Sequence, residues 1–574
     1  MSFETSPFDP ETPDLFGAYP RLSEAQIETL LPLGERKTTA AGDVLFRQGD
    51  LQCDFIVVLE GTVAIVEGSG RDERVLSIHG PGRFLGEIAI LTGQASFVSA
   101  VVQRPGEVLE VSPSRLRDLV ARGGGLGDAL LRALLLRRSI LLEVGVGFRI
   151  IGSPYSPDTR RLREFAARNR LPHTFVDLEV DHDAEALLRA LGVGPEETPV
   201  VIWRGTEVLR NPSNADLAEV VGLRTSAPPA DVCDLLIVGA GPAGLAAAVY
   251  GASEGLQTVI LDAVATGGQA GTSPRIENYL GFPAGISGGE LADLAVIQAE
   301  KFGACITVPA IASALERDGE HHALRLDDGR VLCARTVIIA SGVRYRKLEV
   351  EGLDRFEGAN VFYAATLVEA RQCVDDPVVI VGGGNSAGQA AVFLARYAVA
   401  VRLLIRHDDL SRDMSRYLAD RIDHDARIAV ERCTEVCGYT GDSRLEQVVV
   451  ADTRTGDRRT IPARALFVFI GAEPHVTWVG EHVALDDCGY VLTGRDISVD
   501  DRHDRTARSA MMLETTSPGV FAVGDVRSGS IKRVASAVGE GSMAVRVVHE
   551  RLRELGVLID AGSASASASV TPLR

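Results

Sequence analysis

Two glycine-rich turns are the residues of this chain whose types and spacing point most clearly to chemistry. The first, GAGPAG at 239–244, follows the apolar run 235–238 and leads into an alanine-rich segment. In such a turn the first glycine makes the tight bend, the second lets the backbone approach a pyrophosphate, and the third packs helix against strand. The next hydrophobic run ends at Asp262, whose carboxylate can accept hydrogen bonds from both hydroxyls of an adenosine ribose. This spacing predicts a dinucleotide site.

The second turn, GGGNSA at 382–387, has the same setting but a different charge beyond it. It follows the apolar run VVIV and precedes a helical segment and a further apolar run. No acid ends that further run; Arg406 and His407 stand there, and Arg412 follows. Cations suit the 2′-phosphate of NADPH, so the pattern favours NADPH over NADH, although NADH and a plain solvated basic turn both stay open.

The cysteines are informative through their spacing. Eight occur, and no two have the spacing of a CxxC pair. The pattern excludes a disulfide-stapled scaffold and a zinc ribbon, and we expect no metal site. The cysteines lie at positions 53, 233, 305, 333, 373, 433, 437 and 488.

The remainder of the chain must supply the elements that hold these residues. With 574 residues, 46% hydrophobic and 24% charged, it is globular and long enough for three or four domains. Its net charge of −19 argues against a nucleic-acid or membrane partner. The acidic start is unlike a signal peptide, and the longest apolar stretch is interrupted by Arg132, Arg137 and Arg138, so we expect a soluble cytoplasmic protein.

Hydrophobic periodicity divides the chain into four pieces and a tail. The first piece shows short β-runs, then helical spacing from Pro113 to Val144, which indicates a small β-barrel followed by helices. The second alternates strand and helix patterns, and the third and fourth each contain one glycine turn. The expected pieces are 1–145, 146–228, the discontinuous 229–349 with 472–556, the insertion 350–471, and a flexible low-complexity tail, 557–574.

Residues 230–555 resemble the low-molecular-weight thioredoxin reductase family through several motifs in the right order: GAGPAG, GGQ, IENYLGFP, GVRYRKL, VVIVGGGNSA, and FAVGDV with ASAVGEGSMA. The resemblance implies a homodimeric oxidoreductase with FAD in the outer domain and NADPH in the insertion, in which hydride passes from NADPH to FAD and then to an acceptor. It assigns to FAD the residues Gly239, Gly241, Pro242, Ala243, Asp262, Gly267, Gly268, Gln269, Asn278, Gly524, Asp525, Val534 and Ala535. It assigns to NADPH the residues Gly383, Gly384, Asn385, Ser386, Ala387, Arg406, His407 and Arg412.

The chain departs from this family where the family has a redox-active Cys-Ala-Thr-Cys. The matching residues are Ala364, Ala365, Thr366 and Leu367, so no catalytic thiol is predicted. Ala and Leu cannot form the thiolate that disulfide reduction requires. We therefore expect electrons to leave the flavin for an unknown acceptor. A non-catalytic sensor that binds FAD and NADPH is the alternative, and a true thioredoxin reductase would need Cys373, or Cys433 with Cys437, as a relocated pair.

The second piece resembles the glutaredoxin/thioredoxin fold, with Thr198-Pro199 at the position of its cis-proline. The redox motif of that fold is here Ser153-Pro154-Tyr155-Ser156, and a serine hydroxyl forms no disulfide. The module is expected to be a scaffold, with a docking or coupling role as the other interpretation.

Residues 20–145 resemble the cyclic-nucleotide-binding domain through AGDVLFRQGD, FIVVLEGTVAIVE and RFLGEIAILTG. The resemblance implies a phosphate-binding cassette that contains Gly86, Glu87, Ile88 and Ala89, but Ser96 takes the place of its arginine. A cyclic nucleotide, another small ligand, and a purely structural barrel all stay open. The three resemblances predict a multidomain fold: a β-barrel of cyclic-nucleotide-binding type, a thioredoxin-like α/β module, and an α/β flavoprotein with two dinucleotide-binding domains.

Overall fold

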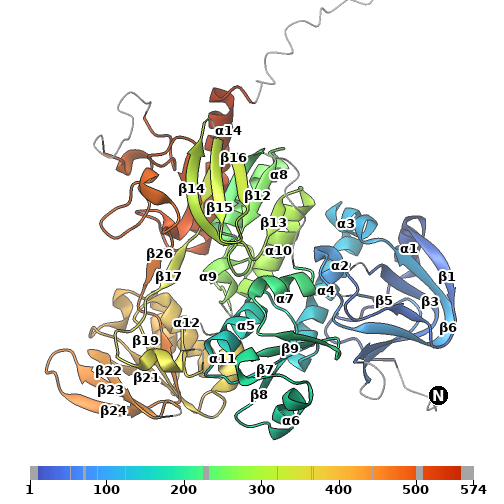
Figure 1. The fold of residues 1–574 in the computed structure, drawn as a ribbon, viewed down its shortest axis with the longest axis horizontal. Helices are drawn as coiled ribbons and strands as arrows, with labels where there is room; N and C mark the ends of the chain where they lie inside the picture. The colour runs from blue at the N-terminus through green and yellow to red at the C-terminus, as the bar shows by residue number, and fades with distance from the viewer. Residues whose placement is uncertain are drawn as a thin grey trace, which may run out of the picture. The chain divides into compact units, whose positions relative to one another are not determined.

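The computed structural model contains two compact units, Met1–Arg224 and Thr225–Arg574 (Figure 1). No helix among the described residues is long and apolar enough to cross a membrane. The described residues are 11–51, 53–68, 73–86, 88–122, 124–223, 232–273, 275–319, 321–357, 359–363, 365, 367–442, 444–498 and 509–557.

The first unit begins with an antiparallel sheet in the order β1-β6-β3-β4, with β2 paired to β6 and β5 paired to β3. Its inward side chains, among them Ile56, Leu85 and Val108, are buried together with Leu141 from the helix that follows. The expected β-runs and helices are present, but β1 was not foreseen because its GERKTT sequence is polar and mostly exposed. The elements are α1 (Glu24–Leu30), β1 (Gly34–Thr39), β2 (Val44–Phe46), β3 (Phe55–Glu67), β4 (Arg74–His79), β5 (Phe84–Leu85), α2 (Ala89–Thr92), β6 (Ser99–Val111), α3 (Pro113–Ala121) and α4 (Gly125–Val144).

The first unit continues with a four-stranded sheet in the order β10-β9-β7-β8. β7 and β8 are parallel, whereas β9 is antiparallel to both β7 and β10. The Thr198–Pro199 peptide bond, just before β9, is cis, as expected from the sequence. The elements are β7 (Phe148–Gly152), α5 (Pro157–Arg168), β8 (His173–Asp177), α6 (His182–Ala190), β9 (Val200–Trp203), β10 (Glu207–Arg210) and α7 (Asn214–Val220).

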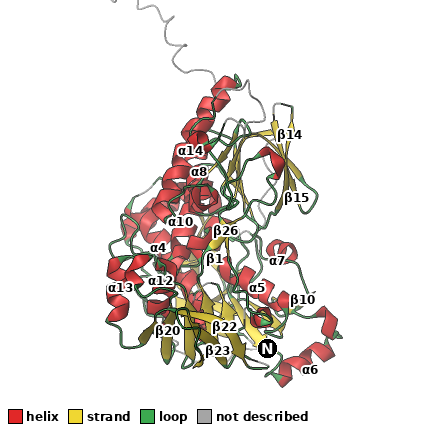
Figure 2. Ribbon diagram, turned by 90° about the vertical axis from the view of Figure 1, so that its left-hand side faces the viewer, coloured by secondary structure: helices red, strands yellow, loops and turns green. Residues whose placement is uncertain are grey.

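The second unit contains a sheet in the order β13-β12-β11-β16-β15-β14, and β27 pairs in parallel with β16. Strands from both sides of the expected insertion thus share one sheet. Helices α8 and α14 pack against each other beside it, and Figure 2 shows them side by side. The elements are β11 (Val232–Val238), α8 (Pro242–Ser253), β12 (Thr258–Leu261), α9 (Gly268–Gly271), α10 (Gly288–Lys301), β13 (Cys305–Thr307), β14 (Ala312–Asp318), β15 (His321–Leu326), β16 (Val331–Ile339), β27 (Val520–Ala522) and α14 (Val534–Glu554).

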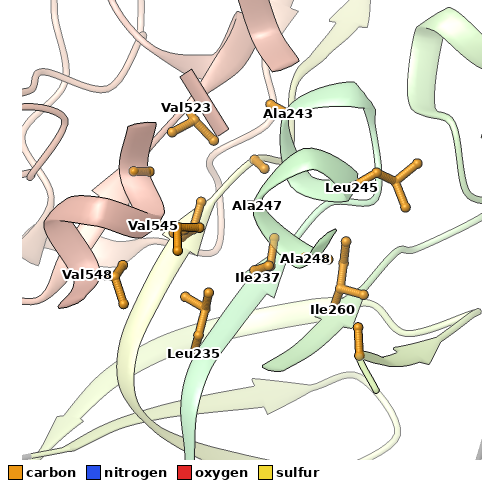
Figure 3. Packing of buried hydrophobic residues seen from close by; sticks show 14 of the residues in the cluster. Leu235, Ile237, Ala243, Leu245, Ala247, Ala248, Ile260, Val523, Val545 and Val548 are labelled. Atoms are coloured by element: carbon orange, nitrogen blue, oxygen red, sulfur yellow. The ribbon is translucent and has the colours of Figure 1, made fainter. Parts of the chain in front are cut away.

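The core under α8 and α14 is built from small and branched side chains. Figure 3 shows Leu235 and Ile237 of β11 with Ala247 of α8 and Val545 and Val548 of α14. The alanines of α8 are buried, and their small side chains let the helix lie close to the sheet. This close packing fixes the start of α8, which is where the first glycine turn lies.

A second sheet in this unit is entirely parallel, in the order β18-β25-β19-β20-β21. A three-stranded antiparallel sheet, β22-β23-β24, follows β21, and a short antiparallel pair, β17 with β26, links the two parts of the unit. The elements are β17 (Val343–Tyr345), β18 (Val361–Phe362), α11 (Leu367–Gln372), β19 (Pro377–Val381), α12 (Asn385–Leu394), β20 (Ala400–Leu404), α13 (Arg416–Asp423), β21 (Ile428–Glu431), β22 (Thr434–Thr440), β23 (Gln447–Asp452), β24 (Arg458–Pro462), β25 (Ala465–Val468) and β26 (Ala472–Pro474).

Candidate functional site

The first glycine turn connects β11 to α8 at the carboxyl end of the parallel strands. Gly239 has φ +111°, and a Cβ there would lie 2.2 Å from the carbonyl oxygen of Ala340. A Cβ on Gly244 would lie 1.9 Å from the carbonyl oxygen of Gly239, so helix and turn touch through backbone. Only glycine permits this path. At Gly241, just before α8 begins at Pro242, a Cβ would have the Gly268 Cα at 3.8 Å as its nearest neighbour, so there is room beside the backbone.

Asp262 is tied to this turn. The register pairs Val238 with Leu261, so Asp262 follows β12 directly beside Ala240. Its Oδ2 accepts a hydrogen bond from the Ala240 amide at 2.9 Å, and its Oδ1 accepts from the amides of Val264 and Ala265, each at 3.0 Å. A carboxylate oxygen can accept two hydrogen bonds, so Oδ2 keeps capacity for a hydroxyl donor.

Gln269 lies at the start of α9, directly after Gly267 and Gly268. Its Nε2 donates to the carbonyl oxygen of Val343 at 3.3 Å. Its Oε1 is buried and has no hydrogen-bond partner among the described residues. A buried amide oxygen without a donor is costly, so this atom fits a group that brings an N–H into the site. Asn278, predicted to join the same site, is exposed.

Gly524 and Asp525 approach the first turn from the other end of the chain. A Cβ on Gly524 would lie 2.9 Å from the Cβ of Ala243, so β27 delivers this loop onto α8. Burial raises the pKa of the Asp525 carboxyl, and Lys532 partly offsets that effect. Val534 and Ala535 begin α14 a few residues later.

Glu540 is a residue of this site that the sequence did not reveal. Its Oε2 accepts from the Gly524 amide at 2.8 Å and from Arg527 Nε at 3.1 Å, and its Oε1 accepts from Arg527 Nη2 at 2.6 Å. Both side chains of the ion pair are at most 17% exposed. The signal was available, since an acid inside the helix motif ASAVGEGSMA and an arginine after GDV are both charged residues in apolar surroundings.

The second glycine turn connects β19 to α12 in the parallel sheet. Gly382 has φ +140°, and a Cβ there would lie 2.3 Å from the carbonyl oxygen of Phe469. Gly383 and Gly384 are open, because a Cβ on either would have no neighbour closer than 3.8 Å. Ser386 and Ala387 lie in the first turn of α12, where Ala387 is buried and Ser386 is exposed. The turn thus presents backbone to a ligand as the first turn does.

The polar residues predicted around this turn differ in their surroundings. The Oδ1 of Asn385 accepts from the backbone N and the Oγ of Ser415, both at 2.8 Å, so this oxygen anchors a loop instead of facing a nucleotide. Arg406, His407 and Arg412 are all exposed, and Arg412 Nη1 lies 3.1 Å from His407 Nδ1. The three basic residues therefore lie together on one loop after β20.

The stretch that matches the family's cysteine pair contains no thiol. Ala364 and Thr366 lie outside the described residues, Ala365 is buried, and Leu367 begins α11. A cavity of about 300 Å³ has Tyr363, the residue just before this stretch, in its wall. The rest of the wall is formed by residues 347–353 and Glu357.

The structure shows no paired cysteines at the positions considered for a relocated redox pair. None of the eight cysteines forms a disulfide. Cys433 is buried just before β22, and Cys437 lies within that strand. Cys373 is buried, and burial raises the pKa of its thiol to about 12.

Residues 233–541, a little over half of the chain, match the family model of the pyridine nucleotide-disulphide oxidoreductases. The chain belongs to this family. Thioredoxin reductases from Streptomyces clavuligerus and Treponema pallidum are 32% and 33% identical to it over 55% and 54% of this chain and 92% and 94% of theirs. The crystal structure of Lactococcus lactis thioredoxin reductase in the FR conformation superimposes with a TM-score of 0.51 and 27% identity, covering 56% of this chain and 99% of that one.

Membership of this family confirms the prediction of an oxidoreductase of thioredoxin-reductase type. Residues 36–122 match the cyclic nucleotide-binding domain, which confirms the expected N-terminal domain of this oxidoreductase.

The cassette of the N-terminal domain lies between β5 and β6. A Cβ on Gly86 would lie 2.0 Å from Ile90 Cδ1, and Ile88 and Ala89 form the start of α2. Glu87 lies outside the described residues. The Oγ of Ser96 donates to the Val98 carbonyl oxygen at 2.8 Å, so the hydroxyl is engaged locally.

Two buried arginines of α4 contact the two ends of this cassette. Arg137 Nη1 donates to the Gly86 carbonyl oxygen at 2.8 Å, and Arg138 Nη2 donates to Gln94 Oε1 at 2.9 Å. The guanidinium of Arg138 also lies over the ring of Phe97, 5.2 Å from its centroid. Sequence reasoning noted both arginines only as interruptions of an apolar stretch. Their side chains support the cassette from outside the sheet core.

In the four-stranded sheet of the first unit, the serines that replace the redox cysteines serve local structure. Ser153 Oγ donates to Glu179 Oε1 at 2.6 Å. The Oγ of Ser156 accepts from the Thr159 amide and caps α5. Both hydroxyls are thus occupied by neighbouring groups of the chain.

Proposed function

We propose that this chain is an FAD-dependent NAD(P)H oxidoreductase that delivers electrons to an external acceptor without an internal cysteine pair. The observation that carries the proposal is the pair of open glycine turns at the carboxyl ends of β11 and β19, with the orphaned Gln269 Oε1 beside the first. Bound FAD supplies two-electron chemistry, accepting a hydride from a reduced nicotinamide and releasing electrons to an acceptor.

The residues of the first turn fit FAD. The open backbone at Gly241 suits its pyrophosphate, and the free capacity of Asp262 Oδ2 suits an adenosine ribose hydroxyl. Gln269 Oε1 suits the N–H of a flavin ring. The carboxyl of Asp525, partly buried and without a hydrogen-bond donor among the described residues, suits a ribityl hydroxyl.

The missing thiols support direct delivery to the acceptor. Reduction of a disulfide needs an attacking thiolate and a second thiol that resolves the mixed disulfide. Residues 364–367 provide neither, and the remaining cysteines lie apart. A quinone, an iron–sulfur protein or dioxygen are the acceptors we propose.

The test is an anaerobic titration of the purified protein with NADPH and with NADH while the visible absorbance of the flavin is followed. Bleaching by either nucleotide, followed by sustained turnover with a quinone, supports the proposal. Absence of bleaching contradicts it and favours the non-catalytic sensor. The same preparation, analysed by light scattering, tests the homodimer that we propose from the family resemblance.

We further propose that a cyclic nucleotide or another small ligand at the cassette regulates the enzyme. The end of the cassette touches the four-stranded sheet region of the same unit. The Ala95 amide donates to the Val221 carbonyl oxygen at 3.0 Å, and the rings of Phe97 and Trp203 meet edge to face with centroids 5.5 Å apart. We propose that this region is a thioredoxin-like scaffold. Through these contacts, a change in the conformation of the cassette would be transmitted to it.

Cyclic AMP is the first probe for this regulation. If it binds, we expect hydrogen exchange to change both in the cassette and in β9, the strand that ends at Trp203. In a Phe97→Ala variant, the change in β9 should disappear while the change in the cassette stays. Exchange changes confined to the cassette would argue against coupling. No change in either region at saturating cyclic AMP and cyclic GMP would exclude cyclic nucleotides as the ligand.

A further inference from the structure

We propose that Asp413 accepts a hydrogen bond from the adenosine ribose 2′-hydroxyl of the nicotinamide dinucleotide and so makes NADH the preferred reductant. This inference rests on the proposed function and names the substrate of its second glycine turn. It also runs against the sequence pattern, in which the cations after β20 favour NADPH.

The two glycine turns can be aligned through their strand registers. In the first, Val238 pairs with Leu261, and the next residue is Asp262. In the second, Val381 pairs with Leu404, and the next residue is Ile405. The position that holds the ribose-binding acid in the first turn therefore holds an isoleucine, 2% exposed, in the second.

A carboxylate nevertheless reaches this place. In the first turn the acid contacts Ala240, the second residue of the turn; the equivalent residue in the second turn is Gly383. A Cβ on Gly383 would lie 3.8 Å from Ile405 Cγ2 and 4.0 Å from Asp413 Oδ2. Asp413 thus lies near Ile405. It is a loop residue, and it provides the carboxylate that is missing at the end of β20.

The loop that carries Asp413 is fixed against the turn. Ser415 donates two hydrogen bonds to Asn385 Oδ1, both at 2.8 Å. Met414 is 4% exposed and packs where a Cβ on Gly388 would lie only 2.6 Å from its sulfur. Because both residues that follow Asp413 are held by α12, its carboxylate stays close to Gly383.

The charge balance around the ribose decides between the two nucleotides. An exposed carboxylate beside Gly383 accepts a 2′-hydroxyl but repels a 2′-phosphate, which carries negative charge and offers no donor. Arg406 and the His407–Arg412 pair face solvent on the same loop and are the groups that would favour the phosphate. Because Asp413 lies closer to the turn than these basic side chains do, we expect NADH to bind more tightly than NADPH.

The experiment measures equilibrium binding of NAD⁺ and NADP⁺ to the oxidised, FAD-loaded protein by calorimetry at fixed ionic strength. We expect wild type to bind NAD⁺ about tenfold more tightly, and Asp413→Asn to lower the ratio of the two affinities by about tenfold. Asp408→Asn, which removes an exposed charge from the same loop, should leave the ratio unchanged. Thermal unfolding of each variant controls for folding.

Two results would overturn the proposal: tighter binding of NADP⁺ by wild type, or an Asp413→Asn variant that weakens both nucleotides equally. Because oxidised nucleotides are used, the outcome does not depend on hydride transfer. If the flavin is not bleached but Asp413→Asn lowers the ratio of NAD⁺ to NADP⁺ affinity, the proposed reaction is therefore contradicted while the role of Asp413 is supported.

Discussion

Glu540 shows how one charged side chain organises the end of the candidate flavin site. It accepts hydrogen bonds from the Gly524 amide and from Nε and Nη2 of Arg527, and neither side chain of the ion pair is more than 17% exposed. Because the pair is partly buried, removal of one member leaves the other charge without its counterion. The residue lies in the helix that starts with Val534, yet its contacts belong to the loop before it.

Replacement Glu540→Ala is expected to lower the free energy of unfolding by about 3 kcal/mol, since the Gly524 amide loses its acceptor and Arg527 loses its counterion. It should also lower the FAD content of the purified protein, because Asp525 follows the released amide. Chemical denaturation and flavin absorbance measure the two effects. Glu316→Ala, which breaks the exposed Arg325–Glu316 pair, should change neither; an equal loss in that control would refute the argument.

His322 gives a residue-scale prediction for pH dependence. Burial, with Arg317 nearby, lowers the pKa of His322 from its usual 6.5 to about 4. The unfolded chain therefore binds a proton on this residue between these two values while the folded chain does not, so stability falls as pH drops through that window. Between pH 7 and pH 5 the loss is on the order of 2 kcal/mol.

A His322→Gln variant should lack this part of the pH dependence. Its unfolding free energy, measured by urea denaturation at the two pH values, is expected to decrease less than that of wild type. His424→Asn, which alters an exposed histidine, serves as control. A wild-type slope in His322→Gln would show that His322 does not set the acid stability.

At the scale of elements, the contact between α8 and α14 depends on one glycine. A Cβ on Gly541 would lie 2.1 Å from the carbonyl oxygen of Ala243, whereas a Cβ on Gly539 of the same helix meets nothing within 4 Å. Gly541→Ala should therefore force the helices apart, cost about 1–3 kcal/mol of stability and reduce FAD binding. Gly539→Ala should instead stabilise the helix by about 0.5–1 kcal/mol.

Thermal unfolding and FAD content of the two glycine variants form a matched pair. The chemical change is the same, the helix is the same, and only the neighbour of the new methyl group differs. Equal behaviour of Gly541→Ala and Gly539→Ala would mean that the close approach of α8 and α14 is not required for the cofactor site.

The sequence was most predictive where one segment alone determines the structure. GAGPAG followed by Asp262 needs only a strand, a turn and the next strand, and the structure joins the Asp262 carboxylate to the Ala240 amide. The strand β1 was missed because GERKTT is polar and mostly exposed, so it lacks an alternating apolar pattern. The strand β10 was missed because EVLR is only four residues long and has two adjacent apolar residues, which also do not alternate.

Residues brought together by loops were beyond the reach of the sequence pattern. Asp413 lies nine residues after Leu404, and it is brought back to the turn by the hydrogen bonds between Ser415 and Asn385 and by the packing of Met414 at Gly388. Arg137 and Arg138 interrupt an apolar stretch of the sequence, and nothing in that pattern showed that both are buried against cassette atoms and aromatic rings. Long side chains with a planar charged group can be buried in this way when carbonyl oxygens accept their hydrogen bonds.

At the scale of the whole molecule, each of the two units has a core of its own. In the first unit Phe148 is fully buried and contacts Trp203, with ring centroids 6.3 Å apart. In the second, Leu235, Val545 and their neighbours form the cluster under α8. A unit with its own core can unfold as a cooperative body, so calorimetry of the full chain is expected to show two transitions.

FAD should act on only one of these transitions. A ligand that binds the folded form of one unit raises the stability of that unit by mass action, by about 2.7 kcal/mol at a free concentration one hundred times its dissociation constant. Added FAD is therefore expected to raise the transition of the second unit and leave the other in place. Phe148→Ala should lower the other transition alone, since it removes a buried ring at a cost of about 3–5 kcal/mol. A single transition that both changes shift together would mean that the chain unfolds as one body, and the two cores would then have to be treated as one cooperative system.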